Sequence, residues 1–214
     1  SSRKEKDNLN IDFTDSSLFV FDIFKDNIEV FLKFYKPDFI INCIGITTRR
    51  FGNIDIDKIH YCNSNLPHAL SKWVEKNNSK LIHFSTDCVF SGTNGNYEEE
   101  SLTDATDVYG ASKAEGEVLN SDNTLTIRTS MIGREVYNHT ELLEWVLSRN
   151  NKEINGYVKA IYSGVTTCWM GEVITKIIKE NIHLSGLYNI SSSPISKYDL
   201  ITMICNIFNL NIKI

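Results

Sequence analysis

The sequence has no apolar run that approaches the length of a membrane-spanning helix, and no apolar segment typical of a secretory signal. Its five cysteines are odd in number, widely scattered and without a C-x-x-C pair. This pattern favours thiols in a reducing cytosol over disulfides or a zinc site. The five histidines are equally dispersed, with no H-E-x-x-H spacing. These absences predict a cytoplasmic protein with no membrane segment and no protein-ligated metal.

Clusters of basic residues are also missing. The formal net charge is -5, and the sequence contains neither a basic stripe nor a polybasic segment. This charge disfavours binding to nucleic acid or to an anionic membrane. Apolar residues make up 42% and charged residues 23% of the 214 residues, which is an ordinary globular composition. The chain is long enough for one domain, or one and a half, with a substantial core.

Apolar strand-like runs alternate with amphipathic helix-like segments along most of the chain. Strands are expected at residues 18–23, 39–44, 80–90, 125–129 and 186–190, and helices at 27–35, 57–77, 109–120, 141–148, 169–179 and 197–208. The run 39–44 is almost continuously apolar, which is typical of a parallel strand buried on both faces. The alternation predicts an α/β fold with a doubly wound parallel sheet, in which ligands bind at the carboxyl ends of the strands.

The segment 81–117 carries the residues with the clearest chemistry. A short apolar strand ends at Ser85 and Thr86, where hydroxyls can face a cleft. Tyr109 and Lys113 are four residues apart, so on a helix they share one face. A neighbouring ammonium favours the phenolate and lowers the tyrosine pKa from about 10, which suits proton exchange with a carbonyl or alcohol. A Tyr-x-x-x-Lys pair also occurs by chance, with the lysine side chain reaching solvent.

Three motifs carry a family resemblance. They are FSTDCVFSG at 84–92, the acidic segment 100–105 and VYGASKAEGE at 108–117. Together they resemble the extended short-chain dehydrogenase/reductases, in the branch of the dTDP-4-dehydrorhamnose reductase type. The resemblance implies a Rossmann-like fold and the NAD(P)H-dependent reduction of the 4-keto group of a nucleotide-linked deoxysugar, for deoxysugar or surface-polysaccharide synthesis.

The resemblance also implies roles for individual residues. Tyr109 would donate the proton to the keto oxygen, Thr86 would orient that oxygen, and Lys113 would lower the Tyr109 pKa and hold the nicotinamide ribose. The residues implied to bind the cofactor are Asp22, Ile23, Asn42, Cys43, Ile44, Gly45, Ser85, Tyr109, Lys113 and Thr129. The residues implied to meet the substrate are Asp87, Cys88, Val89, Met131, Ser163 and Thr166.

Several of these residues, and some of their neighbours, have a second interpretation. Asp22 suits a cap for the helix that follows it equally well. Asn63 is expected to support the cofactor strand from behind rather than to take part in catalysis. Arg49 and Arg50 suit the diphosphate of the substrate, although two arginines in a polar loop are often simply solvated.

The sequence departs from the family in two respects. It has no G-x-x-G-x-x-G turn, whose backbone N–H groups hold a dinucleotide diphosphate. We therefore expect a truncated piece that begins after the family's second strand and binds the cofactor poorly. Cys88 stands where the rhamnose reductases usually have tyrosine, which leaves the sugar open. The expected parts are a Rossmann-like cofactor-binding part at 1–133, lacking its first strand, and a small substrate lobe at 134–214.

The cofactor and the partners follow from the resemblance. The cofactor is NADP or NAD, and Arg3 and Lys4 favour NADPH because a basic residue near the second strand suits a 2′-phosphate. The expected partner is a nucleotide sugar, and the sequence also allows a homodimer. One alternative is a nucleotide-sugar epimerase or dehydratase, which recycles the hydride. Another is a non-catalytic binding partner like the regulatory β-subunit of methionine adenosyltransferase, which resembles the same branch.

Overall fold

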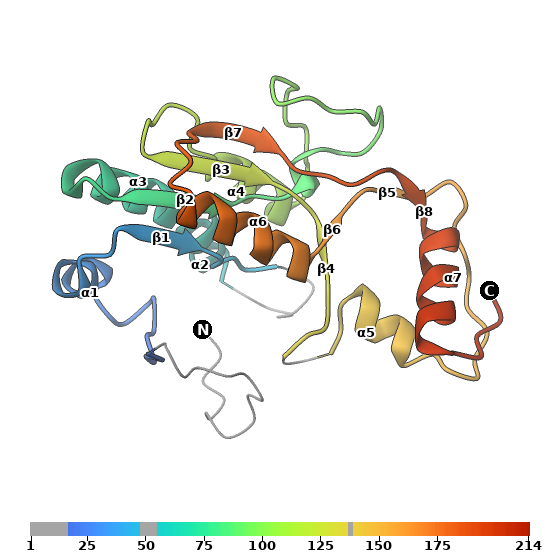
Figure 1. Cartoon of the computed structure of the whole chain (residues 1–214). Helices are drawn as coiled ribbons and strands as arrows, with labels where there is room; N and C mark the ends of the chain where they lie inside the picture. The colour runs from blue at the N-terminus through green and yellow to red at the C-terminus, as the bar shows by residue number, and fades with distance from the viewer. Residues whose placement is uncertain (1–16, 48–54, 137–138) are drawn as a thin grey trace.

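A four-stranded parallel sheet organises the protein. The computed structural model describes residues 17–47, 55–136 and 139–214, and its main sheet has the order β1-β2-β3-β7 (Figure 1). The strands are β1 (Phe39–Asn42), β2 (Lys80–Phe84), β3 (Thr124–Arg128) and β7 (Gly186–Asn189). Each neighbouring pair is parallel. The predicted parallel α/β architecture is confirmed.

Helices cover both faces of the sheet, because successive side chains of a strand point to opposite sides. Leu81 of β2 packs with α1 (Ile28–Tyr35) and α3 (Leu66–Asn77). Ile82, the next residue of β2, packs with α6 (Thr167–Lys179) on the opposite face. Figure 1 shows the sheet between these helices, which is the doubly wound arrangement expected.

A smaller lobe lies beside the sheet and is built by β4, α5, β5, β6, β8 and α7 (Figure 1). Of the intervening elements, α6 packs on the sheet and β7 belongs to it. The core of the lobe is formed by residues of α5 and α7, including Val146 and Ile201, which are fully buried. Two short two-stranded ladders, β4 with β6 and β5 with β8, complete the lobe. The elements are α5 (Leu142–Leu147), α7 (Lys197–Phe208), β4 (Met131–Ile132), β5 (Ile161–Tyr162), β6 (Val165–Thr166) and β8 (Ile195–Ser196).

The helix predicted at 57–77 is continuous in the structure but not uniform. It consists of α2 (Ile56–His60), a π-helical segment (Tyr61–Asn65) and α3. Pro67 lies in the first turn of α3 and has no backbone N–H to donate to the Asn63 carbonyl, which interrupts the regular i→i−4 pattern at this point. The π-helical segment carries Asn63 and Ser64 toward α4 (Val108–Glu115), to which both side chains hydrogen-bond.

The predicted strand at 18–23 is wrong. Residues 17–22 form no strand, and the segment has no strand partner within the described part of the chain. Its apolar side chains pack on α1 instead: the ring centroids of Phe19 and Phe21 lie 6.1 and 5.3 Å from that of Phe31. An apolar run alone does not fix a strand, because a strand also needs a neighbour to accept its hydrogen bonds.

Two further expectations need correction. β1 is parallel, as predicted, but it is not buried on both faces: Ile41 is 44% exposed. This is because α6 packs over Ile82, Leu125 and Ile127 of β2 and β3 on that side of the sheet. The helix expected at 109–120 ends at Glu115, and Gly116 is its C-cap.

None of the helices in the described ranges is both long and apolar enough to cross a membrane.

Candidate functional site

Thr86 and Tyr109 meet at the carboxyl end of β2. Thr86 caps the 3-10 turn Asp87–Val89, and its hydroxyl accepts a hydrogen bond from the Cys88 N–H at 3.2 Å. Asp107 caps α4 and so fixes the backbone of Tyr109. The Thr86 hydroxyl donates to the Asp87 Oδ1 at 3.2 Å and lies near enough to the Tyr109 hydroxyl to influence its pKa. The structure therefore brings together two of the three predicted catalytic side chains.

Glycine at position 110 allows this close approach. A Cβ on Gly110 would lie 2.3 Å from the Cys88 carbonyl oxygen and 2.5 Å from the Ala105 Cβ. These distances are far below any real Cβ contact. The first turn of α4 can reach the turn that follows β2 only because the residue after Tyr109 has no side chain.

The pKa of Tyr109 differs from the expectation. We expected Lys113 to lower it, but burial raises the pKa of Tyr109 above its ordinary value. The nearby Thr86 hydroxyl lowers the pKa in part, while the charges of Asp87 and Glu141 raise it further. The phenol is therefore held protonated at neutral pH, because desolvation and nearby carboxylates both disfavour phenolate.

Lys113 lies one turn further along α4, and its side chain does not reach solvent. It is 3% exposed, and its Nζ donates a hydrogen bond of 2.6 Å to the Phe84 carbonyl oxygen at the end of β2. Burial lowers the pKa of Lys113 to about 8, against the opposing influence of Glu117 and Cys43. The interpretation that this lysine reaches into solvent is wrong, and a buried ammonium lies beneath the site.

The turn after β1 is held from two directions. The Asn42 Oδ1 accepts the Ile44 N–H at 3.1 Å. Asn63 holds the next part of the turn, since its side chain accepts the Ile46 N–H at 2.8 Å and donates to the Ile46 carbonyl and to the Ser112 hydroxyl, both at 3.0 Å. The predicted supporting role of Asn63 is confirmed.

Gly45 in this turn has an open flank. A Cβ at Gly45 would meet only the Asn63 Oδ1, at 3.6 Å, which is an ordinary contact. The packing of the protein itself therefore does not require glycine here, whereas a ligand lying flat on the backbone would. Cys43 and Ile44 beside it are exposed, and the ammonium of Lys113 acts on the Cys43 thiol. These residues fit the contact surface of a dinucleotide cofactor.

His83 lies behind this turn, in the middle of β2. Its Nδ1 is 3.1 Å from the Asn42 Nδ2, and because the Asn42 Oδ1 accepts from Ile44, the amide donates to His83. The Nε2 therefore carries the proton, and it has no hydrogen-bond partner in the described part of the chain. Burial, together with the charges of Lys113 and His68, holds the His83 pKa well below its usual 6.5.

This histidine predicts an acid-sensitive fold. The unfolded chain binds a proton near pH 6.5 and the folded chain does not, so stability falls as the pH drops below about 6.5, with a slope of up to about 1.4 kcal/mol per pH unit. We expect His83→Gln to flatten this slope between about pH 5 and 6.5 in urea unfolding, because glutamine can accept from Asn42 but cannot titrate. His183→Gln, at an exposed position, is the control. An unchanged slope in His83→Gln would contradict the prediction.

The remaining residues expected to bind the cofactor lie in different surroundings. Ile23 is buried in the core between α1 and α3. Asp22 closes a turn, accepting the Phe24 N–H at 3.2 Å, so it does not cap the following helix, whose cap is Asn27. Ser85 and Thr129 are buried at the carboxyl ends of β2 and β3. Arg3, Lys4, Arg49 and Arg50 lie outside the described residues.

A cleft of about 290 Å³ opens between the end of β3 and the lobe. Met131 lines it, as do Tyr162, Glu141 and Lys197. Two charges relate the cleft to the predicted catalytic residues, because the charge of Asp87 acts on the Tyr162 hydroxyl and that of Glu141 acts on Tyr109. The cleft therefore lies within electrostatic range of the Thr86–Tyr109 pair.

The other residues expected to meet the substrate differ in how accessible their side chains are. Asp87 and Cys88 are exposed, but Val89 is fully buried, so its side chain is not available to a ligand. Ser163 is half-buried, and the Thr166 hydroxyl caps α6 by accepting the Trp169 N–H. Thr167, rather than Thr166, is among the residues that line the cleft.

The sequence interpretation missed Tyr162, Glu141 and Glu117. Glu141 acts electrostatically on Tyr109, although 32 positions separate them in the sequence. Glu117 lies four residues after Lys113, a spacing that could have pointed to it. For Tyr162 and Glu141 the sequence contains no comparable signal, because only the folding of the lobe brings them to the cleft.

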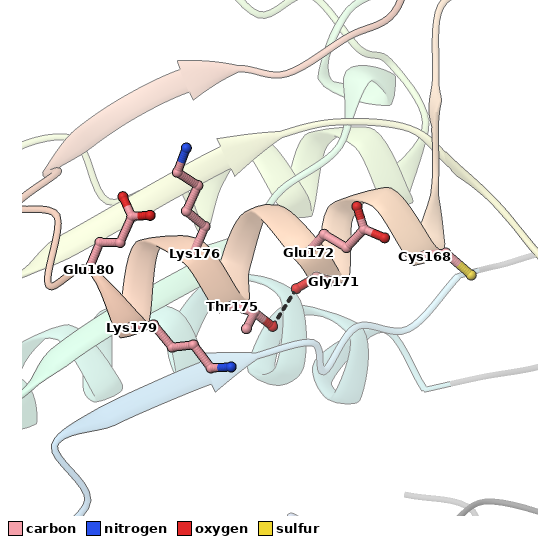
Figure 2. Close-up of a pocket in the computed structure, with 7 residues that line it drawn as sticks. All are labelled: Cys168, Gly171, Glu172, Thr175, Lys176, Lys179 and Glu180. Carbon is pink, nitrogen blue, oxygen red and sulfur yellow. Dashed lines mark hydrogen bonds between the residues drawn. The ribbon is translucent and has the colours of Figure 1, made fainter.

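Another hollow, along the outer face of α6, contains none of these residues (Figure 2). Its lining includes Glu172, Lys176, Lys179 and Glu180, which are charges of both signs spread along the helix. The Thr175 hydroxyl is bonded to the Gly171 carbonyl of the same helix at 2.7 Å. This arrangement is typical of a solvated helix face. The candidate functional residues therefore remain those at the carboxyl ends of the strands.

Comparisons with known proteins identify the family of this chain. The family model of the RmlD substrate binding domain matches residues 11–212. A dTDP-4-dehydrorhamnose reductase of Aggregatibacter actinomycetemcomitans is 29% identical over 185 residues, which are 82% of this chain and 63% of that protein. The methionine adenosyltransferase 2 subunit beta of Rattus norvegicus is 25% identical over 192 residues, which are 82% of this chain and 56% of that protein. The chain thus spans less than two thirds of the length of these curated relatives.

Solved structures share the fold. The crystal structure of a hypothetical dTDP-4-dehydrorhamnose reductase from Sulfolobus tokodaii matches with a TM-score of 0.74 and 26% identity, over 87% of this chain and 67% of that one. A dTDP-4-dehydrorhamnose reductase from Bacillus anthracis, in complex with NADP, matches with a TM-score of 0.77 and 20% identity, over 96% and 76%. The Rossmann-like fold is confirmed, and by the match of its family model this chain belongs to the RmlD substrate binding domain family.

Proposed function

We propose that this chain forms the catalytic and substrate-binding part of an NAD(P)H-dependent reductase that acts on the 4-keto group of a nucleotide-linked deoxysugar. The observation that carries the proposal is the placement of the Thr86 hydroxyl near the Tyr109 hydroxyl, with the buried ammonium of Lys113 one helical turn from Tyr109 and a cleft of about 290 Å³ nearby. The similarity to dTDP-4-dehydrorhamnose reductases over 82% of the chain supports this substrate class. In this proposal residues 1–133 serve the cofactor and 134–214 mainly the sugar nucleotide.

Each of the three side chains has a distinct task. The hydroxyls of Thr86 and Tyr109 hold the keto oxygen between them, and Tyr109 donates its proton to that oxygen as it becomes an alkoxide. A raised pKa of the Tyr109 phenol suits reduction, because the phenol then stays protonated until a stronger base, the alkoxide, forms. Lys113 would hold the nicotinamide ribose, since its pKa of about 8 leaves it mostly charged at neutral pH, and it fixes the end of β2 through the Phe84 carbonyl.

The cofactor and the wider setting are also part of the proposal. Bound NADPH or NADH would supply the hydride, and Asn42, Cys43, Ile44 and Gly45 would hold the ribose and diphosphate along their exposed backbone. Asp87, Cys88 and Met131 would meet the sugar. We infer a role in deoxysugar or surface-polysaccharide synthesis, in the cytoplasm.

The test is a fluorescence titration with NADPH and then NADH, followed by an assay of NADPH oxidation with dTDP-4-dehydrorhamnose. We expect weak but saturable binding of at least one cofactor, since the sequence has no Gly-rich turn, and net oxidation that depends on the keto sugar. Interconversion of nucleotide sugars without net cofactor consumption would favour an epimerase or dehydratase instead and would contradict the reductase.

One comparison favours a second function. The similarity to the methionine adenosyltransferase 2 subunit beta covers as much of this chain as the similarity to the reductase. Stable co-purification with a methionine adenosyltransferase, together with no turnover of keto sugars, would support a non-catalytic binding role. The retention of Thr86, Tyr109 and Lys113 in one contact network favours the reductase.

A further inference from the structure

A buried ion pair lies beside the proposed catalytic residues, and the reaction as described does not use it. Glu117 and Arg128 form two parallel hydrogen bonds, from Nε to Oε1 at 2.8 Å and from Nη2 to Oε2 at 2.7 Å. Their side chains are only 3% and 5% exposed. Removing both charges from water is costly, so a buried pair of this kind is weak evidence of a contribution to stability. Its other contacts therefore indicate what it does.

The Glu117 carboxylate reaches the end of β2. Its Oε1 also accepts the Ser85 hydroxyl at 2.7 Å, and Ser85 immediately precedes Thr86. The Ser85 N–H donates to the Ile127 carbonyl of β3 at 2.8 Å, so both polar groups of this residue are held. The carboxylate also acts on Lys113, four residues earlier. Burial lowers the pKa of Lys113, whereas Glu117 and Cys43 raise it and so favour the charged form. Glu117 thus holds the side chain of the residue before Thr86 and favours the charged form of Lys113.

Arg128 reaches in the opposite direction, to the long loop 90–107. Its Nη1 donates to the Glu99 carbonyl at 3.1 Å, and its guanidinium lies over the ring of Phe90 at 4.9 Å. The Phe90 ring stacks on that of Tyr97 at 4.2 Å with an angle of 2° between the planes. One guanidinium therefore holds both the start and the middle of the loop.

The loop has two further attachments. Asn189 at the end of β7 donates its N–H to the Glu99 Oε1 at 2.7 Å and its side-chain amide to the Tyr97 carbonyl at 3.2 Å. The two ends of the loop are joined where the Val89 carbonyl accepts the N–H groups of Asp104 and Ala105, both at 3.1 Å. These ends lead directly to Cys88 on one side and to α4 with Tyr109 on the other. The position of the loop therefore affects the distance between Thr86 and Tyr109.

We propose that Glu117 and Arg128 are positioning residues, which tie the loop 90–107 to the ends of β2 and β3 and thereby hold Thr86, Tyr109 and Lys113 in register. The part that concerns catalysis rests on the proposed reductase function. The part that concerns the loop stands on the contacts alone, and the two parts have separate tests.

The loop is tested by proteolysis with a glutamate-specific protease, because Glu98 and Glu100 are exposed within it. Arg128→Lys keeps the charge but loses the two-pronged bond to Glu117 and the bond to Glu99. We expect cleavage at residues 98–100, identified by mass spectrometry, to be at least about tenfold faster, while the circular dichroism spectrum is unchanged. The matched control is Arg149→Lys, which removes a guanidinium lying 5.3 Å from the Trp145 ring in the lobe. Equal cleavage rates in Arg128→Lys and the parent would overturn the proposal.

The catalytic part is tested by Glu117→Gln, which removes the charge but keeps the shape. We expect kcat for keto-sugar reduction to fall at least about tenfold with little change in KM, and the high-pH limb of the rate profile to move to lower pH, because Lys113 loses its proton sooner. Glu153→Gln, in an exposed ion pair with Lys213, is the control. A parallel loss of kcat with no movement of the pH limb would indicate a merely structural role.

The outcomes separate the two proposals. If the parent chain reduces no keto sugar, the proposed function fails and the proteolysis result still decides whether the ion pair holds the loop. If the parent is active and both variants behave like the parent, the function stands and the positioning role is wrong. If Glu117→Gln does not fold, Arg128→Lys is used for both measurements, the cleavage rate at residues 98–100 and kcat. We then expect faster cleavage to be accompanied by a lower kcat.

Discussion

Replacing Tyr109 with phenylalanine is expected to leave the fold intact and to lower kcat for keto-sugar reduction by about 10² to 10⁴. The substitution removes only the hydroxyl that lies near Thr86 and would protonate the keto oxygen. The aromatic ring, and with it the packing at the start of α4, is retained. The measurement is the steady-state rate of NADPH oxidation, with the circular dichroism spectrum as a check on folding.

Tyr188→Phe is the matched control for this experiment. Tyr188 lies on β7 and is partly exposed, away from the residues that line the cleft, so loss of its hydroxyl should leave the rate within about a factor of two of the parent. A Tyr109→Phe variant that retains full activity would rule out the proposed acid. Equal losses in both variants would show that the effect does not come from the site.

Gly116→Ala is expected to destabilise the protein strongly. A Cβ at this position would lie 1.9 Å from the Asn63 carbonyl oxygen and 2.9 Å from its carbon, so backbone would have to move. Gly116 has an ordinary helical φ of -83°, so its role is steric and not conformational. We expect the free energy of unfolding to fall by about 3 kcal/mol or more, measured by urea unfolding with Trp73 in α3 as the fluorescent probe.

A second glycine provides the opposite control. Gly171 lies within α6, and a Cβ there would meet no atom within 4 Å. Gly171→Ala should therefore raise the free energy of unfolding by about 1 kcal/mol, because alanine is the better helix former. If the two variants had the same stability, the close contact between α4 and the π-helical segment would not be important for folding.

The local part of the site could be predicted from the sequence. The four-residue spacing of Tyr109 and Lys113 placed both on one helix, and the apolar run before Ser85 predicted β2. These features depend only on periodicity within a short stretch. The run at 18–23 shows the limit of the same reasoning, since its apolar residues pack as aromatic side chains on α1 and form no strand.

The electrostatic part of the site could not be predicted in this way. The pKa of Tyr109 depends on how deeply its hydroxyl is buried and on Glu141, which comes from the lobe. Likewise, the pairing of Glu117 with Arg128 requires α4 and β3 to be in place. Spacing along the chain gives the identity of neighbouring groups only within one element, whereas desolvation and charge are set by segments far apart in the sequence.

The buried clusters described above share no residue, and this has a consequence for cooperativity. Leu81 and Trp73 belong to one cluster, Ile82 and Met170 to a second across the sheet, and Val146 and Ile201 to a third in the lobe. The third cluster has its own helices, and the lobe shares only Val165 of β6 with the second cluster, so we expect the third cluster to melt first. A single two-state free energy then describes the sheet but not the whole chain, and the lobe is expected to behave as a separate folding unit.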